Sequence, residues 1–133
     1  MSGLLDHVSF GVSDLARSRA FYDGVLAPLG VVRVWDAPDA SGYGYPGRDD
    51  SFAIKEDSAG IAAWSARSHV AFAAPSRDAV TAFHAAGIAL GAVDEGAPAL
   101  CAEYGAGYFA AFLRDPDGYR LEAVLHELGA SGG

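Results

Sequence analysis

The chain has 133 residues, with 17 acidic and 9 basic side chains and a formal net charge of -8 at pH 7. This length suits one compact domain, and the single cysteine, Cys101, excludes an intrachain disulfide and a cysteine zinc cluster. The cations are few and scattered, which argues against nucleic acid as a partner because phosphate binding needs a basic face. No apolar run approaches the roughly 18 residues of a membrane span and no signal peptide precedes Leu4, so we expect a cytoplasmic protein without membrane contact.

A sequence repeat spans about half of the chain. The segment His7-Val8-Ser9-Phe10 is followed, 62 residues later, by His69-Val70-Ala71-Phe72. A repeat this long predicts a single domain, residues 1–133, built from two copies of a small unit at about 4–56 and 67–126. Each copy begins with a histidine at the head of a predicted strand, so we expect the two imidazoles to meet at the seam between the copies.

The first unit predicts a strand, a helix and three further strands. Alternation of apolar and small or polar residues from His7 to Val12 indicates a strand with one apolar face. A helix over 14–26 follows, with Ser13 as its cap, and Pro28 and Gly30 end it. The remaining strands are predicted over 31–35, 43–45 and 52–55.

The second unit repeats this order. It predicts a strand from Val70, a helix over 77–86 ended by Gly87, a strand over 88–93 and a loop at 96–98. The last hairpin has arms over 108–113 and 119–125, joined by a turn whose Pro and Gly suit a tight reversal. Because Arg120, Glu122 and Val124 share one face of the final arm, Glu122 is a carboxylate in an otherwise apolar strand.

The two histidine-headed strands and the ending Phe112-Leu113-Arg114-Asp115-Pro116-Asp117-Gly118-Tyr119-Arg120-Leu121-Glu122 resemble the vicinal oxygen chelate superfamily. This superfamily includes glyoxalase I, bleomycin-resistance proteins and extradiol dioxygenases. The resemblance covers residues 5–126 and implies an α+β fold in which paired βαβββ modules form a curved, eight-stranded half-barrel around a cleft. It also implies a homodimer, in which Trp35 and Trp64 are available for the contact.

The resemblance assigns a divalent metal ion, Fe, Mn, Ni or Zn, to His7, His69 and Glu122, with Glu122 as the catalytic carboxylate. Two imidazoles and one carboxylate leave coordination positions open for two oxygens of a small substrate. The strand of the first unit that would supply a fourth ligand reads Phe52-Ala53-Ile54-Lys55, which disfavours a four-ligand glyoxalase I. Nucleotide cofactors have no motif in the chain. Further residues are expected to bind the substrate: Tyr104, Tyr108, Arg120 and Trp35.

Two classes of function stay open at this stage. The first is a metal-dependent lyase, isomerase or dioxygenase acting on a substrate that chelates through neighbouring oxygens. The second is a non-catalytic protein that binds a small molecule or an antibiotic, as bleomycin-resistance proteins do. In that second case Arg120 or another arginine would neutralise Glu122, because a buried carboxylate must find a partner.

Overall fold

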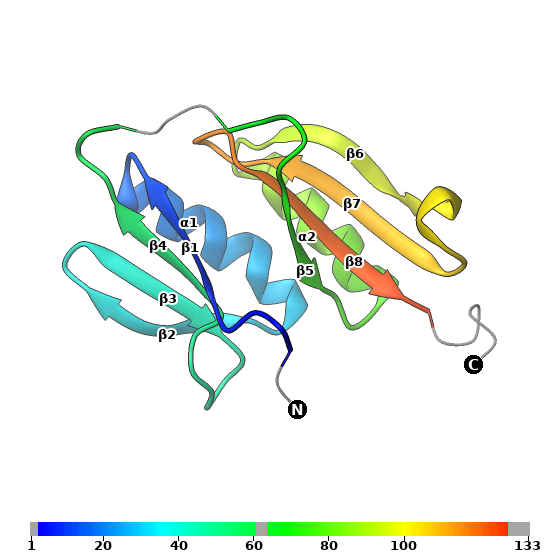
Figure 1. The fold of residues 1–133 in the computed structure, drawn as a ribbon, viewed down its shortest axis with the longest axis horizontal. Helices are drawn as coiled ribbons and strands as arrows, with labels where there is room; N and C mark the ends of the chain where they lie inside the picture. Colours follow the sequence, from blue (N-terminus) through cyan, green and yellow to red (C-terminus); the bar gives the residue numbers. More distant parts are fainter. Residues whose placement is uncertain (1–2, 61–63, 128–133) are drawn as a thin grey trace.

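A computed structural model describes residues 3–60 and 64–127, which form two βαβββ modules (Figure 1). Module 1 contains β1 (Val8–Val12), α1 (Leu15–Leu26), a short 3-10 turn (Ala27–Leu29), β2 (Val32–Ala37), β3 (Ala40–Gly44) and β4 (Phe52–Glu56). Module 2 contains β5 (Val70–Ala73), α2 (Arg77–Ala89), β6 (Val93–Leu100), a second 3-10 turn (Ala102–Tyr104), β7 (Tyr108–Arg114) and β8 (Arg120–His126). The predicted α+β class with paired modules is confirmed. No helix of the described residues is long and apolar enough to cross a membrane.

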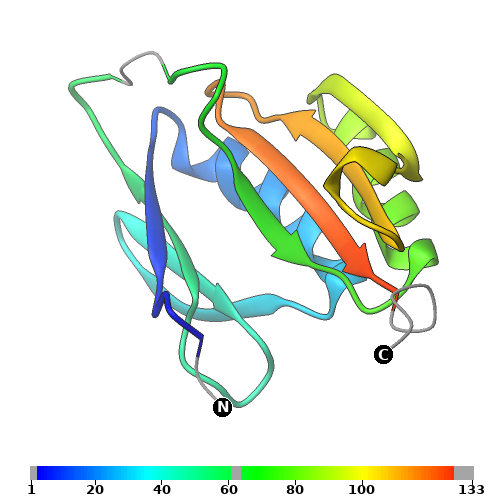
Figure 2. The same cartoon turned by 45° about the vertical axis from the view of Figure 1, so that its right-hand side comes forward.

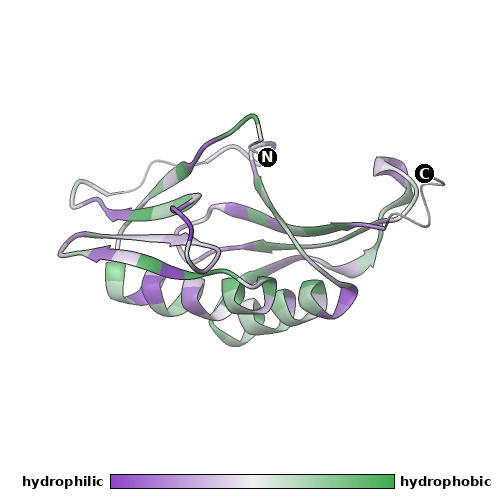
Figure 3. Ribbon diagram, turned by 90° about the horizontal axis from the view of Figure 1, so that it is seen from below, coloured by the Kyte–Doolittle hydropathy of each residue, from purple (hydrophilic) through white to green (hydrophobic). Residues whose placement is uncertain are grey.

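The two modules have the same sheet topology. The strand orders are β1-β4-β3-β2 and β5-β8-β7-β6, and in each sheet the first strand pairs in parallel with the last one. The strands β1 and β5 lie side by side at the centre of the molecule but belong to separate sheets and run in opposite directions (Figures 1 and 2). Both helices lie on one side of the layer of strands (Figure 3), and we call its other side the open face.

The alternation of side chains along the strands builds the core between the strands and the helices. Phe10 and Val12 of β1 are buried, as are Phe52 and Ile54 of β4, and Phe10 and Phe52 pack edge to face. On α1 the buried side chains recur at helical spacing, which turns one stripe of the helix towards the strands: Leu15, Phe21, Tyr22, Val25 and Leu26. Each fully buried large apolar side chain contributes about 1.5–3 kcal/mol to stability.

The turn between β7 and β8 connects module 2 to module 1 through hydrogen bonds. The hydroxyl of Tyr22, on α1, donates to the Asp115 carboxylate, which also accepts the N–H groups of Asp117 and Tyr119 at 2.9 Å each. Burial raises the pKa of Asp115 and holds that of Tyr22 well above its ordinary value. Beside them, Asp117 accepts from the side chains of Ser13 and Arg17 at the start of α1. The tight turn predicted from Pro and Gly therefore also acts as a contact between the modules.

Both helices differ from prediction at one end. The cap of α1 is Asp14, whose side chain accepts from the backbone N–H of Arg17, whereas the Ser13 hydroxyl is engaged with Asp117. Helix α2 continues past Gly87 to Ala89, so the prediction that Gly87 ends it is wrong. A Cβ at Gly87 would lie 2.2 Å from Cδ1 of Leu113, so the glycine serves close packing of α2 on β7.

The third strand of module 2 is also displaced from its predicted position. The structure places β6 at Val93–Leu100, and 88–93 contributes only its first residue. The predicted loop at 96–98 lies inside this strand, where the pairing with β7 is irregular between Asp94 and Gly96 and between Gly96 and Ala99. A bulged edge strand tolerates the glycine and proline that indicated a loop.

Candidate metal and substrate site

The centre of the candidate site is the Glu122 carboxylate on β8. Its side chain is 2% exposed, although it belongs to the open face beside Ala71 of β5 and Phe112 of β7. The carboxylate oxygen Oε1 lies 2.9 Å from Nε2 of His69, and the hydroxyl of Tyr108 donates to Oε2. Both oxygens are therefore satisfied by an imidazole and a phenol.

The tyrosine contact was missed in the sequence because Tyr108 is opposite His126, four residues from Glu122 along β8. Only the length of the phenol and the twist of the hairpin bring the two groups together. Burial, followed by the hydrogen bond to Glu122, raises the pKa of Tyr108, so the phenol remains a proton donor at neutral pH.

Arginine does not neutralise Glu122. Arg120 pairs instead with Glu95 across the open face, and each of these side chains is 27% exposed. The arrangement expected for a non-catalytic protein, with an arginine on the buried carboxylate, is therefore not found among the described residues.

His7 lies apart from this pair. It precedes β1, is exposed, and its Nδ1 lies 2.8 Å from the Asp6 carboxylate. Because β1 and β5 run in opposite directions, the residues that precede them lie at opposite ends of the central pair of strands (Figure 1). The two imidazoles therefore do not meet within one chain, and their convergence on one metal ion stays a prediction. Over residues 3–60 and 64–127, no three His, Cys, Asp or Glu side chains are grouped closely enough to hold a metal ion.

Module 1 has no carboxylate at the position that corresponds to Glu122. In module 2 Ala71 is paired with Glu122, and in module 1 the corresponding residue, Ser9, is paired with Ala53. Ala53 is 2% exposed, so the position is buried in both modules. The structure thus agrees with the sequence in providing no fourth ligand.

A polar cavity of about 650 Å³ opens beside His69 on module 2. Its polar and aromatic walls include Arg67, His69, Glu95, Tyr104, Phe112 and Arg120. The exposed ring of Tyr104 contacts the ring of Tyr108, with centroids 5.3 Å apart. The structure therefore gathers three of the expected substrate residues, Tyr104, Tyr108 and Arg120, around His69 and Glu122.

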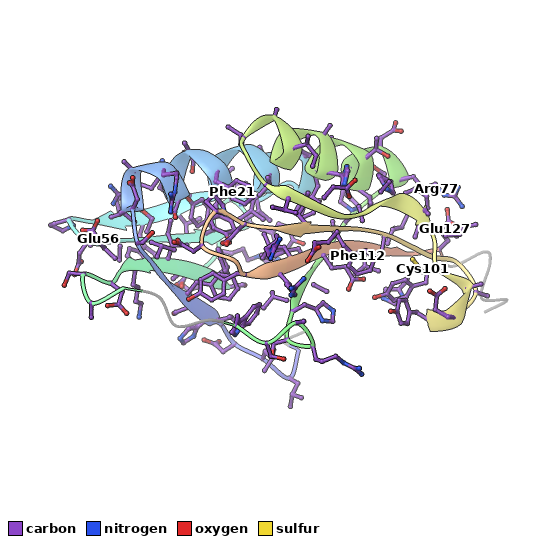
Figure 4. The ribbon with its side chains drawn as sticks, turned by 90° about the horizontal axis from the view of Figure 1, so that it is seen from above. Phe21, Glu56, Arg77, Cys101, Phe112 and Glu127 are labelled. Carbon is purple, nitrogen blue, oxygen red and sulfur yellow. The ribbon has the colours of Figure 1, made fainter. Side chains whose placement is uncertain are left out.

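The tryptophans lie elsewhere. Trp35 lines a separate hollow of about 350 Å³ on module 1, together with His7, and its indole lies against Gly42. Trp64 is partly exposed and packs edge to face on Phe10 and Tyr119, and its role in a subunit contact stays a prediction. Cys101 lies beyond Phe112, towards the end of module 2 that holds Arg77 and Glu127 (Figure 4), and burial raises its pKa, which lowers its reactivity as a nucleophile.

The distance between His69 and Glu122 fits shared ligation of one ion. Nε2 of His69 and Oε1 of Glu122 lie 2.9 Å apart, a hydrogen-bond distance, and the same two atoms would be neighbouring ligands of an ion bound beside them. Imidazole and carboxylate together suit a first-row divalent metal such as Fe, Mn, Ni or Zn. With only His69 and Glu122 as ligands, coordination positions stay open for a third protein ligand from elsewhere.

The family model of the Glyoxalase/Bleomycin resistance protein/Dioxygenase superfamily matches residues 4–123. The chain belongs to this superfamily. The sequence resemblance to the vicinal oxygen chelate proteins is thereby confirmed, whereas no functionally curated protein matches the chain.

Solved structures show the same architecture. A glyoxalase/bleomycin resistance protein from Albidiferax ferrireducens T118 is 35% identical, with a TM-score of 0.80 over 92% of this chain and 99% of that one. A glyoxalase/bleomycin resistance protein/dioxygenase family enzyme from Burkholderia phytofirmans PsJN is 19% identical, with a TM-score of 0.68 over 92% and 98%. A mutant of the fosfomycin resistance protein FosX from Listeria monocytogenes, complexed with Mn(II) and 1S,2S-dihydroxypropylphosphonic acid, is 17% identical, with a TM-score of 0.70 over 98% and 96%. The second and third of these structures, at 19% and 17% identity, show the fold alone.

Proposed function

We propose that the protein is a metal-dependent enzyme, a lyase, isomerase or dioxygenase, that acts on a small substrate chelating through neighbouring oxygens. The observation that supports this most is the buried Glu122 carboxylate, held by His69 and Tyr108 with no neutralising arginine. Burial of a carboxylate is costly, and a site that holds a cation gives that burial a function. The Mn(II) in the FosX complex supports a divalent ion in this fold.

The third ligand in this proposal is His7 of the partner subunit in a homodimer. Within one chain His7 lies away from the His69–Glu122 pair, and yet it occupies the same strand position in module 1 that His69 occupies in module 2. A two-fold dimer that brings module 1 of each chain to module 2 of the other would complete two identical sites at once. Exposed apolar side chains near His7 offer surface for such a contact: Leu4, Leu5 and Tyr45.

The residues of the chain have distinct roles in this site. The metal ion, when bound, supplies Lewis acidity that polarises a substrate carbonyl or stabilises an enolate. Glu122 is the catalytic carboxylate because it is the only charged ligand. Tyr108 occupies Oε2, which directs Oε1 towards the side of His69 and fixes the orientation of the carboxylate. The cavity lined by Tyr104 and Arg120 would hold the rest of the substrate.

Complementation between two inactive chains tests this assembly. His7→Ala and Glu122→Gln each remove a ligand from both sites of their own homodimer. When the two variants are unfolded and refolded together in equal amounts, mixed dimers should regain one intact site, giving about a quarter of the wild-type Mn(II) sites. Equilibrium dialysis against Mn(II) counts these sites.

The outcomes separate three arrangements. Recovery of sites in the mixture, with none in either variant alone, supports the shared site. No recovery in the mixture contradicts the contribution of His7 from the partner, and undiminished Mn(II) binding by both separate variants contradicts the metal site altogether.

A second candidate function is supported by the hollow on module 1. It combines the exposed indole of Trp35 with the carboxylates of Asp6, Asp49 and Asp50. Such a surface suits non-catalytic binding of a cationic aromatic molecule, in line with the bleomycin resistance proteins of this superfamily. Quenching of tryptophan fluorescence by bleomycin, lost in Trp35→Ala, would favour this function over the enzyme.

A further inference from the structure

The cavity beside His69 has a positive wall in a strongly acidic protein. Two of the chain's nine cationic side chains, Arg67 and Arg120, line it, and Glu95 is the one acidic residue described among its walls. Arg67 is exposed and forms no ion pair with the described residues. The cavity therefore has more positive than negative charge before any ligand enters.

The arginine on β8 is only partly satisfied. One terminal nitrogen of Arg120 pairs with Glu95, but its Nε is buried and has no hydrogen-bond partner. A buried donor without a partner costs about 1–3 kcal/mol, and a ligand oxygen that accepts from this N–H would recover that cost.

A second arginine lies directly opposite on the neighbouring strand. Arg114 of β7 is paired in register with Arg120 of β8 at the end of the hairpin. Like charges directly across an antiparallel pair are destabilising, and an anion bound nearby relieves that repulsion. Arg114 does not itself line the cavity, but the register of the hairpin adds positive charge beside Arg120.

We propose that this cavity binds the anionic end of the substrate, a compact oxyanion group such as a carboxylate or a phosphate, through Arg67 and Arg120. The proposal rests on the function proposed above and adds to it the class of substrate. Guanidinium groups bind both kinds of oxyanion through two parallel N–H donors, which orients the ligand as well as attracting it. The size of the cavity, about 650 Å³, lies in the range of small-molecule sites.

The position of His69 links this anion site to the reaction. His69 lines the same cavity and contacts Glu122, so a molecule held by the arginines at one end can present further oxygens next to the His69–Glu122 pair. Glu95 acts as an internal counterion that Arg120 must partly exchange for the substrate.

Anion binding to the metal-free protein tests the proposal without depending on the metal site. Inorganic phosphate and acetate are titrated separately into the protein in the presence of a chelator, and binding is followed by amide chemical shifts in NMR spectra. Arg67→Gln and Arg120→Gln should each weaken binding about tenfold or more, whereas Arg48→Gln, in the exposed turn before β4, is the matched control and should leave it unchanged. The anion that binds more tightly identifies the oxyanion class.

A variant that is expected to bind the anion more tightly shows that the changes in affinity do not come from misfolding. Glu95→Gln removes the competing carboxylate, so it should tighten anion binding several-fold, a gain that a damaged fold does not produce. Equal affinities in Arg67→Gln, Glu95→Gln and the wild type would overturn the proposal, as would an equal loss in Arg48→Gln. Mn(II) affinity is measured in the same variants, so loss of the metal site and loss of the anion site are recognised separately.

Discussion

Modules 1 and 2 have the same strand order and the same register between their central strands, but they differ at the open-face position that Glu122 occupies in module 2. Where module 2 has Glu122, hydrogen-bonded to His69 and Tyr108, module 1 has the methyl group of Ala53. The fold depends on the side chains that face the helices, which are apolar in both modules. A residue on the open face can therefore change without changing the architecture, and this freedom allows one module to hold the chemistry.

The largest expected effect follows from removing the residue that distinguishes module 2. Glu122→Gln keeps the shape of the side chain and deletes its charge, so Mn(II) affinity should fall at least about 100-fold. Isothermal titration calorimetry measures the change. Glu127→Gln is the matched control, because Glu127 follows β8 and pairs with Arg77 away from the site. Equal affinities of Glu122→Gln and the wild type would remove Glu122 from the ligand set.

The reverse change in module 1 sharpens the comparison. Ala53→Glu places a carboxylate at the equivalent buried position, opposite Gly42 of β3, without the Tyr108 hydroxyl that donates to Glu122 in module 2. One carboxylate oxygen is then left without its donor, and the free energy of unfolding should fall by about 2 kcal/mol. Urea denaturation measures it. Lys55→Glu, exposed on the same strand, should cost close to nothing, and a similar cost in both variants would contradict the argument from burial.

Removing a hydrogen bond between the modules should have a smaller effect, on stability. Tyr22→Phe removes the hydroxyl that donates to the buried Asp115, and stability should fall by about 1–3 kcal/mol while the aromatic packing is retained. Thermal denaturation followed by circular dichroism measures the loss. The exposed Tyr45 supplies the control, Tyr45→Phe, for which no change is expected.

The smallest effect concerns the outer edges of the modules. The helix and edge strand are joined by Asp23 and Arg33 in module 1, and by His84 and Asp94 in module 2. The His84 hydrogen bond, then the N–H of Gly96, hold the pKa of Asp94 below its ordinary value. A lowered carboxyl pKa stabilises the fold above the unfolded value, about 3.9, and this stability is lost as pH falls through the folded pKa.

Asp94→Asn should therefore show a slightly smaller drop in melting temperature between pH 7 and pH 3 than the wild type does. Because both side chains are near the surface, the difference is small. Asp39→Asn is the control, because the exposed Asp39 carboxylate forms no hydrogen bond with the described residues, and its melting temperature should drop as much as that of the wild type. If the melting temperature of Asp94→Asn drops as much as that of the wild type, the His84 contact does not form in solution.

Local patterns in the sequence predicted most of the fold. Period-two alternation marked β1, and the Asp115–Gly118 turn marked the hairpin of β7 and β8, because these signals depend only on neighbouring residues. The role of Gly87 was not predictable, since a glycine can either end a helix or make space for a neighbouring side chain, here that of Leu113. The 96–98 segment was predicted as a loop because a bulged strand can have the composition of a loop.

The candidate site was predictable only in part. The position of Glu122 on an otherwise apolar strand followed from strand alternation, whereas its nearness to His69 was implied by the family resemblance and arises in the structure from the parallel pairing of β5 with β8. The separation of His7 from this pair depends on how two modules pack, and the contact from Tyr108 depends on side-chain length and hairpin twist. Neither is encoded in residue spacing.

The bond from Tyr22 to Asp115 also has a consequence for synthesis on the ribosome. The two residues are 93 positions apart, and Tyr119, which donates to the carbonyl of Gly11 and stacks on Phe10, is 108 positions from that carbonyl. The amino-terminal half therefore emerges long before the groups that complete its core, and closing such long loops slows folding. A nascent chain that stops before this turn should remain open to proteases until the last hairpin arrives.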